Sequence, residues 1–162
     1  MSSLTEHPAV WARTDVPEGL GLGALLPEPD GHRLEAGETV VVGGERFLTR
    51  FSVRTDLAWT TRRVYAEVLS SQGLESVTLD AHGGHWSGPD GVPRPELVGC
   101  LDVDVAATPL TNTLPIRRLG LRHRASGRGG SGTVLPRAEG ADAPNVLREV
   151  RESSRTRYPA RR

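Results

Sequence analysis

The feature that most constrains the fold of this chain is a strict alternation of side chains in RFLTRFSVR, residues 46–54. Successive side chains of an extended strand point to opposite faces, so a period of two separates them into two sets. One set is Phe47, Thr49, Phe51 and Val53, and the other is Arg46, Leu48, Arg50, Ser52 and Arg54. The pattern predicts a strand that is covered on one face.

Several other runs have the character of strands and are separated by short turns such as Gly43-Gly44. No segment between them has a helical period, which favours an antiparallel meander with one core face. Because an open sheet must close or blunt its edges, we expect a mainly β, curved antiparallel sheet or incomplete half-barrel with little helix. The predicted strands are 39–42, 46–54, 57–69, 74–81, 97–106 and 116–121.

The two ends of the chain differ from this central part. The stretch GLGLGALLPEPDGHRLEAGE reads as loop because it is rich in Gly and Pro, and GLGLGA lacks the lysine of a phosphate-binding loop. Residues 122–162 are rich in Arg, Gly, Ala and Ser and contain few large apolar residues. The sequence therefore predicts a loop-rich arm (1–35), an antiparallel β domain (36–121) and a mostly disordered tail (122–162).

Charge is unevenly distributed along a chain of zero net charge. Residues 1–121 contain 10 Arg and 16 Asp or Glu, whereas residues 122–162 contain 10 Arg and 4 Asp or Glu. Arginine-rich tails can bind nucleic acid through phosphates, but this one lacks interleaved aromatic residues, so no nucleic-acid partner is expected. Neither a secretory signal nor a transmembrane segment is visible, which predicts a cytoplasmic protein.

The segment LDVDVAATPLTNTLPIRRL, residues 101–119, concentrates polar groups. Asp102 and Asp104 would lie on one face of a strand, either as a carboxylate pair or, by preference, in a structural network that joins Asp104 to an arginine of residues 116–119. The Thr-Pro and Leu-Pro steps favour a rigid corner. Alternatively, Thr111, Asn112 and Arg117 could line the mouth of a pocket for sugar or phosphate.

Metal and nucleophile chemistry have little support. His82 and His85 lie in a glycine-rich loop without a third strong ligand, so we expect no metal site and no cofactor. Cys100 is the only cysteine, which excludes an intramolecular disulfide, and it is expected to be a small packed residue. The aromatic side chains are expected in the core or on a concave ligand-binding surface; they include Phe47, Phe51, Trp59, Tyr65 and Trp86.

The run GCLDVDVAATPLTNTLPIRRL, with GHWSGPDGVPRPELV before it, resembles the most recognisable motif of the putative glycolipid-binding family. The resemblance extends over about residues 36–121, and more weakly to Trp11. It implies an all-β, half-barrel-like sheet with some helix, similar to bacterial lipoprotein-carrier folds. After about residue 121 the sequence departs from the family pattern.

On this basis the leading hypothesis is non-catalytic binding of a small amphipathic ligand, a lipid or glycolipid, in the concavity of the sheet. The candidate ligand-binding residues are Arg50, Arg63, Trp86, Asp104, Asn112 and Arg117. Two alternatives remain: a sugar- or phosphate-processing enzyme that uses Asp102 and Asp104, and a truncated family member without function. The sequence leaves the oligomeric state open.

Overall fold

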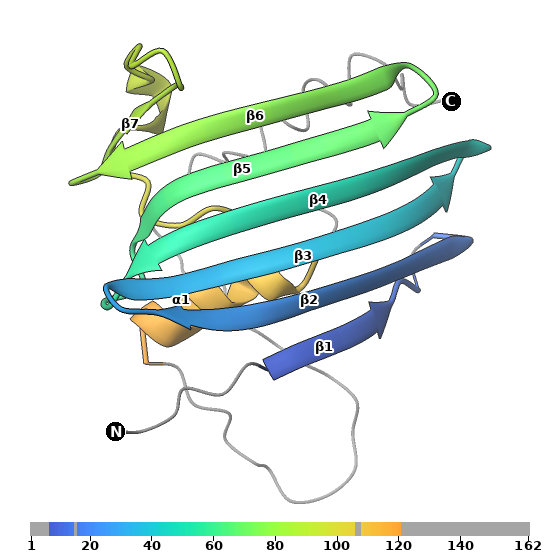
Figure 1. Cartoon of the computed structure of the whole chain (residues 1–162), viewed down its shortest axis with the longest axis horizontal. Coiled ribbons are helices and arrows are strands. Elements are labelled where there is room, and N and C mark those ends of the chain that lie inside the picture. Colours follow the sequence, from blue (N-terminus) through green and yellow to red (C-terminus); the bar gives the residue numbers. More distant parts are fainter. Residues whose placement is uncertain (1–6, 15, 106–107, 121–162) are drawn as a thin grey trace, which may run out of the picture.

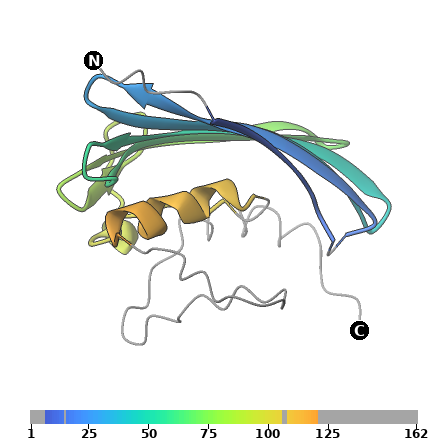
Figure 2. The ribbon, with the colours of Figure 1, turned by 90° about the horizontal axis from the view of Figure 1, so that it is seen from below.

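The computed structural model describes residues 7–14, 16–105 and 108–120 of the chain. Seven antiparallel strands follow one another across a single sheet in the order of the sequence. The sheet is curved and unclosed, and helix α1 lies on its concave side (Figures 1 and 2), which confirms the predicted fold class. The strands are β1 (His7–Ala12), β2 (Glu18–Glu28), β3 (Gly31–Val42), β4 (Glu45–Asp56), β5 (Thr61–Ser70), β6 (Gly73–His82) and β7 (His85–Ser87).

The two faces of the sheet follow the alternation that the sequence shows. We call the concave side, which carries α1, the inner face and the opposite side the outer face. In β4, Phe51 and Val53 are buried on the inner face, whereas Arg50 and Arg54 are exposed on the outer face. The strand predicted over residues 46–54 is confirmed.

The prediction of loop for the glycine-rich stretch before residue 39 is wrong, because β2 and the first part of β3 occupy it. Glycine weakens an isolated strand, but β2 is hydrogen-bonded to β1 on one side and to β3 on the other. Its glycines also make room for other groups. A Cβ on Gly21 would lie 2.2 Å from Cε2 of Trp11, and one on Gly23 would lie 2.9 Å from Cδ2 of Leu110.

These strands also bear on the predicted division of the chain. The boundary between residues 35 and 36 falls inside β3, so the predicted arm and the predicted domain share a strand. Two smaller differences concern turns: β5 begins only at Thr61, and the predicted loop 82–96 contains the short strand β7. The predicted tail lies outside the described residues.

The segment that follows β7 packs against the inner face instead of adding strands to the sheet. It contains the 3₁₀ helices η1 (Pro95–Leu97) and η2 (Leu110–Asn112) and the helix α1 (Thr113–Arg118). The strands predicted over 97–106 and 116–121 are therefore wrong within the described residues. Leu101 is connected to the sheet by one backbone hydrogen bond, from the N–H of Thr61 at 3.0 Å. Pro115 is tolerated in the first turn of α1, where a missing N–H removes no intrahelical bond.

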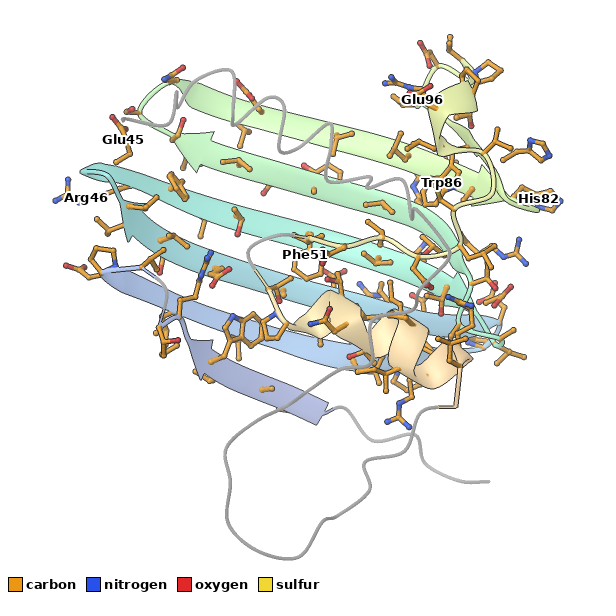
Figure 3. All side chains as sticks on the ribbon, turned by 180° about the vertical axis from the view of Figure 1, so that it is seen from behind. Glu45, Arg46, Phe51, His82, Trp86 and Glu96 are labelled. Atoms are coloured by element: carbon orange, nitrogen blue, oxygen red, sulfur yellow. The ribbon has the colours of Figure 1, made fainter. Side chains whose placement is uncertain are left out.

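The core lies between the inner face and this segment. Trp86 is 2% exposed and donates a hydrogen bond from Nε1 to the backbone oxygen of Cys100 at 3.0 Å. Burial raises the pKa of the Cys100 thiol, in agreement with a packed, unreactive side chain. Figure 3 views the sheet from the side that carries α1 and labels Phe51 and Trp86. The core cluster is Leu34, Ala36, Phe51, Val53, Val64, Ala66, Leu79, Trp86, Leu97, Cys100, Val103 and Leu114.

Candidate functional site

A row of inner-face residues crosses six strands beyond the core cluster, toward the β3–β4 hairpin. The members of the row are partners in the register of neighbouring strands, and we call it the inner row. It combines an indole, a glycine that leaves room for the indole, two carboxylates and two smaller side chains. From β1 to β6 it consists of Trp11, Gly21, Glu38, Thr49, Val68 and Glu75.

Trp11 packs directly on the backbone of Gly21, because a Cβ there would lie 2.2–2.5 Å from three atoms of the indole. The indole nitrogen Nε1 is buried, and no group in the described ranges accepts a hydrogen bond from it. A buried N–H without an acceptor costs free energy relative to the same group in water. Trp11 therefore combines an aromatic ring with a buried N–H donor that has no acceptor among the described residues.

Glu38 lies next to Gly21 in the inner row and is only 3% exposed. A carboxylate is seldom buried unless its charge is compensated by hydrogen bonds or by an ion pair. The hydroxyl of Thr49 donates to the backbone oxygen of Glu38 at 3.4 Å, which ties the two strands together at this point. The row thus places an acceptor-rich group two strands away from the indole donor of Trp11, with only Gly21 between them.

A second aromatic feature lies at the opposite end of the sheet, in the β4–β5 turn. Trp59 has a φ of 68°, which is unusual for a bulky residue. Asp56 fixes this turn by accepting bonds from Trp59 N at 3.0 Å and Thr60 N at 2.9 Å. The ring of His32 stacks on Trp59 with centroids 3.7 Å apart, and the guanidinium carbon of Arg117 lies 5.7 Å from the Trp59 ring centroid. The strained turn therefore joins the sheet to α1.

The polar segment 101–119 forms a corner that fastens α1 to the chain before it. Asp102 receives two bonds from Arg118, one from Nε to Oδ1 at 3.1 Å and one from Nη2 to Oδ2. The hydrogen bond with Asp102 raises the pKa of Arg118. Asp104 accepts a bond from the hydroxyl of Thr111 at 3.1 Å. An aspartate–arginine pair was predicted, but the wrong aspartate was assigned to it.

Replacing Asp102 with asparagine is expected to lower the free energy of unfolding by about 1–3 kcal/mol, because it removes a two-pronged, half-buried ion pair. Asp104→Asn is the matched control, since Asp104 is exposed and an amide oxygen can still accept the Thr111 bond. Urea unfolding followed by circular dichroism measures both variants. Equal effects of the two changes would contradict the assigned role of Asp102.

The structure does not bring the six predicted ligand-binding residues together. Arg50 and Arg63 point from β4 and β5 to the outer face, where Nε of Arg63 lies 3.6 Å from Oδ1 of Asp80. Trp86 belongs to the core, as its 2% exposure shows. The other three residues, Asp104, Asn112 and Arg117, are exposed on the corner and α1.

Several residues of the inner face were not among the predicted site residues. Trp11 and Glu38 lie in or next to the stretch that was read as loop, so their positions could not be aligned with the other strands. The alternation of glycines at 19, 21 and 23 could have identified an inward-facing stripe, because every second residue of a strand lies on one face.

The geometry bears on two kinds of chemistry, metal binding and catalysis by a carboxylate pair. No group of three or more His, Cys, Asp or Glu side chains is arranged to hold a metal ion among residues 7–14, 16–105 and 108–120. Asp102 accepts a hydrogen bond from Arg118, and Asp104 accepts one from Thr111, so the two carboxylates have different partners. An enzymatic role for the pair stays a prediction. None of the helices in the described ranges is both long and apolar enough to span a bilayer.

Comparisons with known proteins agree with this architecture. Residues 8–128 match the profile of a family described as putative glycolipid-binding. A crystal structure of a DUF1089 family protein from Pseudomonas aeruginosa aligns with a TM-score of 0.53 and 31% sequence identity, over 75% of this chain. The alignment covers 61% of the length of that protein. No curated protein matches the sequence. Since the family profile spans most of the sheet and the corner, the chain belongs to the putative glycolipid-binding family.

Proposed function

We propose that this protein binds a small amphipathic ligand, a lipid or glycolipid, on the inner face of its sheet without transforming it chemically. The observation that carries the proposal is the inner row, in which the indole of Trp11 covers Gly21 beside the buried carboxylate of Glu38, and the indole N–H has no acceptor among the described residues. Polar groups placed on a largely apolar concave surface are typical of small-molecule sites. The name of the family is consistent with such a ligand.

The inner row can address both parts of an amphipathic molecule. The indole face of Trp11 suits the C–H face of a sugar ring, while its N–H and the oxygens of Glu38 suit hydroxyl groups. Two apolar residues of the inner face, Val68 in the row and Phe47 in the adjacent row, offer contact to an alkyl chain. Arg50 and Arg63 take no part in this proposal because they lie on the outer face.

A titration with n-octyl β-glucoside, kept below its micelle concentration, tests the proposal. We expect binding to change tryptophan fluorescence, and we expect Trp11→Phe to weaken the affinity about tenfold, the equivalent of one lost polar contact. Gly21→Ala should weaken binding as well, because its Cβ would displace the indole. Isothermal titration calorimetry gives the affinities independently of the fluorescence.

Trp59→Phe is the matched control, since Trp59 lies at the opposite end of the sheet and should leave the affinity unchanged. The proposal fails if Trp11→Phe and Gly21→Ala both bind the glucoside as the parent protein does. It also fails if the parent protein binds no glucoside and native mass spectrometry of protein purified from its own host finds no lipid. Either result would remove the inner row as a ligand site.

A further inference from the structure

The outer face of the sheet carries a row of exposed apolar side chains that the proposed function does not use. Its members are partners in the register of β2 to β6, and we call it the outer ladder. The four leucines are 42–64% exposed, although large apolar side chains of one face usually pack against something. The outer ladder consists of Leu20, Thr39, Leu48, Leu69 and Leu74.

The apolar surface continues beyond the ladder toward β1. Val10 and Leu22 are register partners in the adjacent row and are 68% and 57% exposed. Two shallow hollows of about 550 Å³ and 400 Å³ border the ladder, and Leu48 lines both of them. Leu48 therefore lies at the centre of a contiguous apolar surface that spans several strands.

Charges flank the ladder on both sides, and each side carries both signs. On the side of the β3–β4 hairpin, Glu18 and Arg46 lie in the row that contains Val41. On the other side, Arg50 is the register partner of Glu67. An anionic lipid surface would attract the two arginines and repel the two glutamates, so it gains no net attraction from these flanks, whereas a surface with the same balanced pattern can pair both signs.

We propose that the outer ladder is the interface of a homodimer, in which two copies of this chain pack their outer faces together about a twofold axis near Leu48. A twofold axis places the same patch on both sides of the contact, so the apolar ladder meets itself and its mixed charged flanks can pair. Two sheets that pack face to face interdigitate side chains at a separation of about 10 Å. Leucines that extend from adjacent strands are suited to this arrangement.

Sedimentation velocity of the full chain over a range of concentrations tests the proposal. The parent protein should dimerise, and Leu48→Glu should weaken the dimer at least about 100-fold, because it buries an unpaired carboxylate near the axis. Val98→Glu is the matched control, since Val98 is 53% exposed and lies outside the ladder. At concentrations low enough for all three proteins to be monomeric, thermal unfolding should be the same, which separates loss of association from loss of fold.

Cross-linking supplies a second, independent measurement. Leu48→Cys should form a disulfide between copies under mild oxidation, while Val98→Cys should not, and the buried Cys100 is common to both variants. A parent protein that stays monomeric, or a dimer that Leu48→Glu leaves intact, would overturn the proposal. So would a monomer that co-sediments with phosphatidylglycerol vesicles through Leu48, which would identify a membrane as the occupant.

Discussion

Replacing Leu114 with alanine is expected to lower the free energy of unfolding by about 2–5 kcal/mol, the usual range for truncating a buried leucine. Leu114 is fully buried and belongs to the cluster that contains Leu34 and Phe51. It is the buried residue of the short helix α1, which has too few turns to be stable by itself. The loss should therefore loosen α1 from the inner face.

The control for this prediction is Leu119→Ala, at the end of the same helix. Leu119 is 57% exposed, so its truncation should change the free energy of unfolding by no more than about 0.5 kcal/mol. Guanidinium unfolding followed by circular dichroism measures both variants. If Leu114→Ala were as stable as Leu119→Ala, the packing of α1 against the inner face would be refuted.

Replacing Gly31 with alanine is expected to destabilise the fold by about 3 kcal/mol, at the upper end of the range for overpacking. A Cβ at Gly31 would lie 1.8 Å from the backbone oxygen of Thr55 and 2.9 Å from Cα of Asp56. Backbone atoms cannot move aside as the end of a side chain can. The first residues of β3 would therefore have to separate from β4.

Gly37→Ala, on the same strand, is the matched control. Its Cβ would meet only the backbone oxygen of Thr49, at 3.4 Å, which is ordinary contact. Alanine reduces the conformational entropy of the unfolded chain, so this change should leave the free energy of unfolding unchanged or raise it by up to about 1 kcal/mol. Differential scanning calorimetry compares the melting temperatures of the two variants. Equal melting temperatures for Gly31→Ala and Gly37→Ala would contradict the close approach of β3 and β4.

The alternation in residues 46–54 and 74–81 was sufficient to predict β4 and β6, because most residues there obey the period of two that one-sided burial demands. The exceptions are Leu48 and Leu74 on the outer face and Glu75 on the inner face. The glycines of β2 concealed a strand, since they carry no side chain that could show the period. These glycines leave space for the side chains of Trp11 in β1 and Leu110 in η2. Such contacts between distant segments are not visible in a local pattern.

The corner shows a second reason why a sequence pattern can predict the wrong structure. LDVDV alternates, and Val103 is buried while Asp104 is exposed, but residues 101–105 pack on the sheet without forming one of its strands. The polar pairing was predicted in kind, yet the choice between Asp102 and Asp104 depended on the helix that carries Arg118. Arg50 is instructive as well. The alternation of β4 already places it opposite Phe51, so its assignment to the concave face was inconsistent with the predicted strand.

The order of the strands has a consequence for how the chain acquires its structure. Because every strand pairs with its neighbour in sequence, each hairpin closes only a short stretch of chain. Loop-closure entropy grows with the length of chain enclosed, so this topology keeps the entropic cost of each pairing small. The sheet can grow strand by strand as the polypeptide leaves the ribosome, and the corner, synthesised after the strands, closes over a surface that already exists.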